Sequence, residues 1–294
     1  MASPTPWCLR VMAMGLMLFL QAASAAGVQV TDESGVTTQW ATPPQRIVSL
    51  LPSLTETVCE LGACDRLVGV DRFSNWPASV KPLPQLGGGI DPNVEAIVAL
   101  RPDAVLIAGS SRATNQLRAL GLKVVVLEPK DAAGVRRVLG TVAQMLGADA
   151  QAPQRIWNSI DAAVSAAAQT LPASVKQTRV YFEVNSAPYG AGEASFIGEL
   201  LARLGARNIL PASMGPFPKL NPEFVVRANP DLIMVGDQNF AGQTQRPGWA
   251  GIRALREDRV CVFSVAESDV LVRPGPRMAE AAGILARCLK EKGL

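Results

Sequence analysis

The most informative feature of this sequence is an absence: none of its 294 residues is histidine. Histidine is the commonest metal ligand in proteins, a frequent axial ligand of haem iron, and the usual partner of a nucleophilic serine or cysteine. Its absence excludes His-ligated metal sites, Ser-His and Cys-His nucleophile pairs, and histidine acid–base catalysis. Most hydrolase and metalloenzyme classes are therefore excluded, and we expect neither a metal site nor a cofactor.

The sequence also lacks a strong charge of one sign. Its 28 basic residues are balanced by 25 acidic residues, which gives a formal net charge of +3, and the basic residues form no run. The usual electrostatic basis for binding nucleic acid is therefore missing. With 48% hydrophobic and 18% charged residues, the chain is too apolar to be disordered and long enough for one or two packed domains.

A long hydrophobic run occurs only at the amino terminus. Residues 1–25 combine a basic residue, an apolar stretch from Val11 to Leu20 and the small residues Ala23-Ser24-Ala25. This pattern is typical of a secretory signal peptide, and the apolar stretch is too short for a membrane span. We expect cleavage near Ala25 and export as a soluble protein; an uncleaved anchor is the alternative.

Four cysteines follow the predicted signal peptide, and export makes disulfides possible. Three complete pairings of Cys59, Cys64, Cys261 and Cys288 exist, and their spacing does not choose among them. Cys59 and Cys64 can form a bridge only if the chain turns at Gly62. Small buried thiols without any disulfide are an equally good interpretation.

Short β-rich runs alternate with helical patterns over most of the chain. This alternation predicts an α/β fold with parallel sheets covered by helices on both faces. Ser53 and Glu56 predict a capping box at the first of the helices. The predicted strands are 46–51, 67–70, 104–108 and 123–127 in the first half, and 179–182, 232–235 and 260–263 in the second half.

The middle of the chain has no strand pattern. Apolar residues at Ile156, Ile160, Val164 and Ala167 have helical spacing, which predicts one long helix over about 151–171.

The two α/β halves repeat each other with a constant offset of 128 residues. Each copy reads Asn-x-Glu, a helix, Pro-Asp and a strand. The matching pairs are Asn93/Asn221, Glu95/Glu223, Val98/Val226, Pro102/Pro230 and Asp103/Asp231. We therefore predict two similar lobes, residues 44–132 and 173–294, joined by a helical linker over 133–172, with a ligand cleft between them.

Several aromatic and polar residues follow predicted strands. Ligands in open α/β folds bind beyond the carboxyl ends of the strands, so these residues are candidates for the cleft. They are Phe73, Trp76, Tyr189, Phe217 and the stretch from Asp269 to Arg273, all expected on loops. Core packing accounts better for Trp157 and Phe224, and Trp249 is either a lid or a structural staple.

Glu95 and Glu223 occupy equivalent places, each in the first turn of a helix that an asparagine caps. An acid there is stabilised by the helix dipole, which requires no function. Alternatively, one exposed carboxylate on each lobe can meet basic groups on a symmetric partner.

Catalysis has little support in the sequence. The serines at 49, 53 and 195 have no histidine to activate them, and the glycines at 87–89 belong to no phosphate-binding pattern. A secreted enzyme with a catalytic cleft is kept as the alternative class.

Four segments carry a resemblance to one family: RIVSLLPSLTETVCELGACDRLVGV, PNVEAIVALRPDAVLIA, NPEFVVRANPDLIMVG and SDVLVRPGPRMAEAAGILA. Over about residues 44–290 the chain resembles the substrate-binding proteins with a rigid helical backbone that serve bacterial ABC importers of cobalamin, haem and iron-siderophores. The S-x-x-P-S-x-T-E opening and Pro216-Phe217-Pro218 are most similar to the cobalamin-receptor branch.

The resemblance implies a class III periplasmic binding protein that performs no catalysis. It implies that Glu95 and Glu223 dock on the permease dimer of an importer with a cytoplasmic ATPase. We expect a periplasmic monomer that carries cobalamin or a related corrinoid as transported ligand. The ligand-binding residues implied by the resemblance are Phe73, Tyr189, Phe217, Asp269 and Arg273.

Two other ligands remain open within the same family. A haem could be held by Tyr181 or Tyr189, since tyrosine can ligate haem iron. A ferric siderophore would favour basic residues in the cleft, for which Arg72, Arg112 and Arg273 are the candidates.

Overall fold

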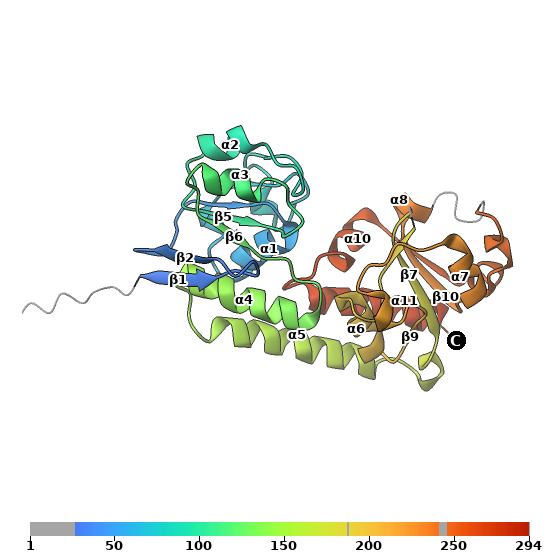
Figure 1. Ribbon diagram of the computed structural model, residues 1–294. Coiled ribbons are helices and arrows are strands. Elements are labelled where there is room, and N and C mark those ends of the chain that lie inside the picture. Colours follow the sequence, from blue (N-terminus) through green and yellow to red (C-terminus); the bar gives the residue numbers. More distant parts are fainter. Residues whose placement is uncertain (1–26, 187, 241–245, 294) are drawn as a thin grey trace, which may run out of the picture.

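The computed structural model describes residues 27–186, 188–240 and 246–293. The predicted signal peptide and its cleavage point lie outside the described residues. Within these ranges, none of the helices combines the length and apolarity needed to cross a membrane. Two α/β lobes stand next to each other over a layer of long helices (Figure 1).

The N-terminal lobe contains a parallel sheet with the strand order β4-β3-β5-β6. Its strands are buried, because helices cover both faces. Successive residues point to opposite faces, so Ile47 belongs to one hydrophobic core and Val48 to another. The elements are β3 (Ile47–Ser49), α1 (Pro52–Glu60), β4 (Leu67–Val70), α2 (Val94–Ala99), β5 (Ala104–Ile107), α3 (Thr114–Ala119) and β6 (Val124–Val126).

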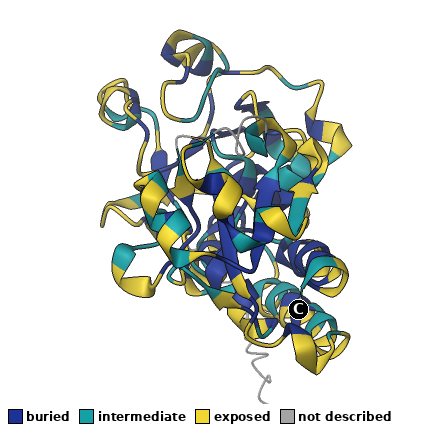
Figure 2. Cartoon of the chain, turned by 90° about the vertical axis from the view of Figure 1, so that its right-hand side faces the viewer, coloured by how far each residue is buried: buried dark blue, intermediate teal, exposed yellow. Residues whose placement is uncertain are grey.

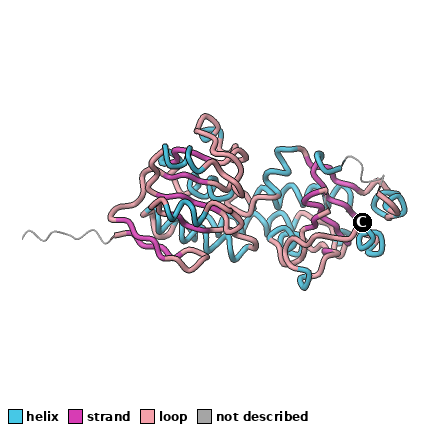
Figure 3. Tube along the Cα trace, turned by 45° about the horizontal axis from the view of Figure 1, so that its top comes forward, coloured by secondary structure: helices cyan, strands magenta, loops and turns pink. Residues whose placement is uncertain are grey.

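The C-terminal lobe repeats this order as β9-β7-β10-β11, again parallel, with β8 added antiparallel to β7. Figure 3 shows the two sheets as separate magenta groups, one in each lobe. Its strands are β7 (Arg179–Asn185), β8 (Tyr189–Gly190), β9 (Arg207–Asn208), β10 (Leu232–Gly236) and β11 (Val260–Phe263). Its helices are α6 (Phe196–Arg203), α7 (Pro222–Ala228), α8 (Asp237–Phe240), α9 (Arg253–Arg256), α10 (Val265–Leu271) and α11 (Met278–Lys292).

The repeated Pro-Asp motif closes each lobe through the same hydrogen bonds. Asp103 Oδ2 accepts from the backbone N–H of Arg46 at 2.9 Å, and Asp231 Oδ2 accepts from that of Arg179 at 3.0 Å. The side chain of each arginine also donates to a carbonyl at the carboxyl end of the helix that leads into the Pro-Asp motif, α2 for Arg46 and α7 for Arg179. The predicted sequence repeat is therefore confirmed as a structural repeat.

The layer beneath the lobes contains two helices where the sequence pattern predicted one. The predicted long helix is present as α5 (Ala152–Gln169), which packs against α11 of the C-terminal lobe. Before it, α4 (Ala132–Leu146) ends at Gly147, whose left-handed φ of 62° is readily adopted only by glycine.

Helix α4 contributes to both lobes. Its residues Val135 and Leu139 belong to the core of the C-terminal lobe, whereas Val138 and Val142 belong to that of the N-terminal lobe. Figure 2 shows the buried residues, in dark blue, gathered inside the molecule, with exposed helix faces around them. Helix α4 is therefore packed into the separate cores of both lobes and connects them at their base.

An amino-terminal hairpin was not predicted. Strands β1 (Val28–Thr31) and β2 (Thr37–Trp40) pair antiparallel, and β1 packs on α4. Asp32 Oδ2 accepts from Val126 N–H at 3.0 Å, while Glu33 N–H donates to the carbonyl of Val126. The hairpin turn therefore covers the edge of β6, and the predicted lobe boundary at residue 44 omits it.

The predicted capping box of Ser53 and Glu56 is wrong. Helix α1 begins at Pro52, with Leu51 as an N-cap that offers no side-chain hydrogen bond. Pro52 occupies the favoured first helical position, which places Ser53 inside the helix. Glu56 is instead buried and turned toward the other lobe.

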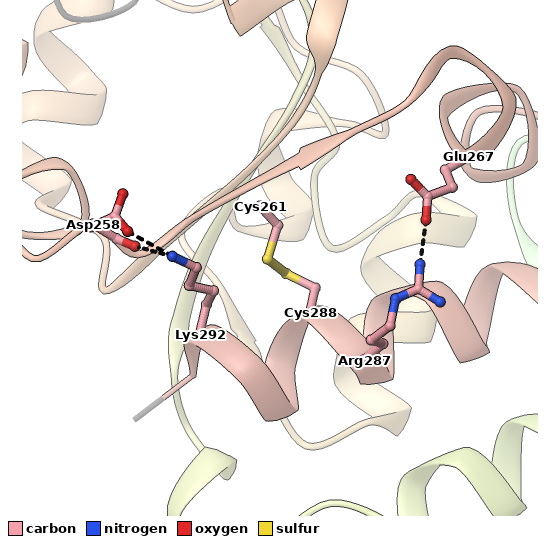
Figure 4. Close-up of a disulfide and its surroundings, with 6 residues drawn as sticks. All are labelled: Asp258, Cys261, Glu267, Arg287, Cys288 and Lys292. Carbon is pink, nitrogen blue, oxygen red and sulfur yellow. Dashed lines mark hydrogen bonds and ion pairs between the residues drawn. A yellow bond between two sulfur atoms is a disulfide. The ribbon is translucent and has the colours of Figure 1, made fainter.

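Both disulfides form, which answers the question that the cysteine spacing left open. Cys59 and Cys64 join the end of α1 to the following turn, where Gly62 has a φ of 80°. Figure 4 shows Cys261 of β11 joined to Cys288 of α11. The ion pairs Asp258–Lys292 and Glu267–Arg287 lie on either side of this bridge.

Replacing Cys261 and Cys288 by serine should lower the free energy of unfolding by about 2–4 kcal/mol, because the bridge closes a long loop in the unfolded chain. Chemical denaturation checks this. The paired change of Cys59 and Cys64 is the control and should have a smaller effect, since those cysteines are only 5 residues apart, against 27 for the other pair. Equal losses would contradict the loop-length argument.

Candidate functional site

A cleft of about 380 Å³ lies where the two lobes meet. This volume is in the range of small-molecule sites. The N-terminal lobe contributes the start of α1, the loop after β4 and the loop after β6. The C-terminal lobe contributes the start of α6, the loop before α7 and the segment from α10 onward. The lining residues are Leu51, Pro52, Ser53, Phe73, Glu128, Pro129, Lys130, Phe196, Phe217, Asp269, Val272, Arg273 and Pro274.

Each lobe supplies an aromatic side chain to this cleft. Phe73, from the N-terminal lobe, is 58% exposed, which is unusual for a phenylalanine. Phe217, from the C-terminal lobe, is half-buried and packs against Phe196 with ring centroids 6.3 Å apart. Covering exposed aromatic surface is favourable, so a ligand with apolar faces can gain binding free energy on both walls.

Four of the five predicted ligand-binding residues line the cleft, namely Phe73, Phe217, Asp269 and Arg273. The fifth, Tyr189, is absent from the lining; it lies in β8, is 38% exposed, and forms a backbone bridge with Lys219. Asp269 was expected on a loop, but it lies in helix α10, which the capping residue Ser264 starts soon after β11. The helix turns the Asp269 carboxylate toward the opposite lobe.

Arg273 is engaged by the protein itself. Its side chain is 6% exposed, and it forms ion pairs with Glu56 Oε1 at 3.0 Å and Asp269 Oδ1 at 2.9 Å. It also donates to Asn75 Oδ1 at 2.8 Å and to the carbonyl of Phe73 at 2.9 Å. The guanidinium therefore belongs to the wall of the cleft, and three of its four partners come from the N-terminal lobe.

Two further contacts complete this junction. Arg277 Nη1 lies 3.6 Å from Glu56 Oε1, and its guanidinium stacks on Trp76 at 4.6 Å from the ring centroid. Asn75 Nδ2 donates to Asp269 Oδ2 at 2.7 Å. We call the set of Glu56, Asn75, Asp269, Arg273 and Arg277 the interlobe brace.

Two acids of the N-terminal lobe are strongly affected by burial. Burial raises the pKa of Glu56 above its ordinary value, and hydrogen bonding and charge from Arg273 and Arg277 oppose this rise. Burial likewise raises the pKa of Asp71, against a hydrogen bond from Ser74 and the charge of Arg273. The carboxylate of Glu56 in the interlobe brace is therefore buried where desolvation disfavours its charged form.

The predicted caps before Glu95 and Glu223 are confirmed. Asn93 Oδ1 accepts from Ala96 N–H at 2.9 Å, and Asn221 Oδ1 accepts from Glu223 N–H at 3.0 Å. Both glutamates are exposed, and in the described part of the chain neither carboxylate has an ion pair or hydrogen bond. Helices α2 and α7 thus present one unpaired carboxylate on each lobe.

Other candidates are placed away from the cleft. Tyr181 is completely buried, with its hydroxyl donating to Glu183 at 3.2 Å, so its oxygen cannot reach a ligand. Trp249 is also fully buried, against Tyr181 and under the guanidinium of Arg246. Trp249 is therefore a structural residue and no lid. Across residues 27–186, 188–240 and 246–293, no group of three or more acids and cysteines could hold a metal ion.

Sequence reasoning missed Glu56 and Asn75 as site residues. Glu56 was assigned to a local cap, although a carboxylate between buried threonines in a helix needs a partner elsewhere. Its partners are Arg273 and Arg277, two arginines at spacing i, i+4. Arg273 is 217 residues away from Glu56 in the sequence, so a local pattern could not connect them.

The chain is similar in sequence to bacterial substrate-binding proteins. Residues 47–264 match a family model described as periplasmic binding protein. The chain is 29% identical over 273 residues to an uncharacterised ABC transporter substrate-binding lipoprotein of Bacillus subtilis, covering 89% of this chain and 85% of the relative. It is 27% identical over 255 residues to a vitamin B12-binding protein of Pectobacterium atrosepticum, covering 84% and 89%.

A solved structure shares the fold. The crystal structure of a periplasmic heme-binding protein from Pseudomonas aeruginosa matches with a TM-score of 0.72 and 27% identity, over 85% of this chain and 94% of that chain.

The substitution Glu56→Gln should change the pH dependence of stability. Because burial raises the folded-state pKa of Glu56 above 4.5, folding favours its protonated form, and the stability it contributes is lost as pH rises through that pKa. The free energy of unfolding of the parent, relative to Glu56→Gln, should therefore fall as pH rises from about 4.5 toward neutrality.

Urea unfolding of both proteins over this pH range measures the difference. A difference that grows with pH would mean that Arg273 and Arg277 outweigh burial.

Proposed function

The chain belongs to the periplasmic binding protein family, as an ABC transporter substrate-binding protein of the vitamin B12, haem and siderophore group, and we propose that it binds cobalamin or a related corrinoid in the interlobe cleft. Its two parallel-rich lobes joined by long helices have the class III architecture that the family resemblance implied. The protein performs no chemistry on the ligand and acts in the periplasm after removal of residues 1–25.

The observation that carries this proposal is the composition of the cleft. Aromatic and aliphatic side chains form both walls, and a corrinoid is a large, partly apolar ligand whose cobalt already has nitrogen ligands. No tyrosine, cysteine or methionine is among the residues that line the described cleft, so a haem iron would find no axial ligand there. The only cation of the lining without an ion pair in the described chain is Lys130, which does not favour a highly anionic siderophore.

Transport then follows from the two-lobed frame. Exposed Glu95 and Glu223, one on each lobe, meet basic groups on the two permease subunits, and a cytoplasmic ATPase powers release of the ligand. The packing of α4 into the cores of both lobes and of α5 on α11 limits the lobes to a small hinge motion.

Haem is the second candidate. Tyr189 is exposed near the carboxyl end of β7, and the similar Pseudomonas aeruginosa structure is that of a heme-binding protein. Because Tyr189 is not among the residues that line the cleft, a haem whose iron it coordinates would have to extend beyond this cleft.

Calorimetric titration of the purified protein should give one-to-one binding of cyanocobalamin and no comparable signal with haemin or a ferric hydroxamate. Phe73→Ala should weaken this binding by about tenfold to a hundredfold, since burying a phenylalanine side chain contributes roughly 1.5–3 kcal/mol. Val36→Ala, an exposed change on the β1–β2 turn at a residue outside the cleft lining, is the control and should bind as the parent does. If the protein binds haemin and not cyanocobalamin, and Tyr189→Phe abolishes this binding, then the ligand is haem and the corrinoid proposal is wrong.

The double substitution Glu95→Ala with Glu223→Ala should abolish ligand uptake by cells while leaving calorimetric affinity unchanged, because the carboxylates lie on docking helices and not in the cleft. Glu60→Ala with Glu291→Ala, also exposed acids without partners in the described chain, is the matched control and should transport normally. Loss of ligand affinity in the first variant would refute the docking role.

A further inference from the structure

Among the described residues, Glu56 is the buried acid that forms ion pairs only with arginines of the other lobe. Its side chain is 2% exposed, and Arg273 and Arg277, which approach its Oε1, follow α10 in the C-terminal lobe. The other two carboxylates that are as deeply buried and paired with arginine, Asp32 with Arg118 and Glu183 with Arg246, stay within one lobe. The charge pair at Glu56 thus crosses the cleft.

The same arginines hold the loop that carries the exposed aromatic wall. Arg273 donates to the carbonyl of Phe73 at 2.9 Å and to Asn75 at 2.8 Å, while Arg277 stacks on Trp76. The position of Phe73 is therefore tied to the C-terminal lobe through Arg273. Movement of the guanidinium would shift both walls of the cleft together.

The pair is poorly suited to a purely stabilising role. Glu56 Oε2 and the neighbouring Ser53 Oγ are buried and have no hydrogen-bond partner in the described chain. A buried ion pair with an unsatisfied oxygen adds little to the free energy of folding, because desolvation offsets its attraction. Such a pair can, however, favour one relative arrangement of the two lobes that it joins.

We infer that Glu56 is a positioning residue for ligand binding, which acts through Arg273 and Arg277 to hold the two lobes at the separation that the cleft requires. Glu56 is not among the residues that line the cleft, so it acts without touching the ligand. This inference rests on the proposed function only in taking the cleft as the ligand site.

The first test measures the separation of the lobes without ligand. Spin labels are attached at Gln116→Cys on α3 and Arg227→Cys on α7, both exposed positions, since the cysteines at 59, 64, 261 and 288 are bonded in disulfides. Pulsed electron resonance should give one narrow distance distribution in the parent and a clearly broadened one in Glu56→Gln. Glu183→Gln, the matched loss of a buried arginine-paired glutamate within one lobe, should keep the narrow distribution.

The second test measures affinity. Cyanocobalamin should bind Glu56→Gln about tenfold more weakly, because only the fraction of molecules with the correct separation is competent, while Glu183→Gln binds as the parent does. Thermal unfolding of both variants separates positioning from loss of stability. If Glu56→Gln does not fold, Arg273→Gln tests the same pair from the other lobe and should also broaden the distribution.

An unchanged distance distribution in both Glu56→Gln and Arg273→Gln would overturn the inference. If the parent protein binds no cyanocobalamin, the corrinoid proposal fails, but the distance measurement still decides the role of Glu56.

Discussion

The contact of Arg273 with Glu56 joins the two lobes at the point where the cleft closes, and the remaining contacts of the site are arranged around it. Arg273 lies just after α10 in the C-terminal lobe, and Glu56 lies in α1 of the N-terminal lobe. The long helices connect the lobes at the base, because α4 packs into the cores of both lobes. The interlobe brace connects the lobes on the cleft side. These two connections together determine how far apart the lobes lie, and so the space that is available to a ligand.

The repeated architecture explains why both lobes contribute residues to the ligand cleft. Parallel strands run in the same direction within each sheet, so their carboxyl ends and the loops that follow gather at one edge. Two such edges face each other across the cleft; the N-terminal lobe presents Phe73 there, and the C-terminal lobe presents Phe217 with Phe196 beside it. The same repeat places Glu95 and Glu223 on equivalent helices, where they are exposed and free for a two-fold partner.

Local patterns made much of this structure predictable. The strand and helix alternation, the asparagine caps and the helix over 152–169 depend on neighbouring residues, and each was found where expected. The failures concern distant partners. Glu56 was read as a cap because Ser53 is close in sequence, whereas Arg273 is 217 residues away. The disulfides and the hairpin that covers β6 also depend on tertiary approach, which spacing does not reveal.

The central claim is that a corrinoid binds between the lobes, and a crystal structure of the protein grown with cyanocobalamin tests it most directly. The claim predicts ligand density between Phe73 and Phe217, in contact with Val272 and Pro274, with Arg273 still paired to Glu56. Density at another surface, or an iron chelate bound through Tyr189 outside the cleft, would contradict it.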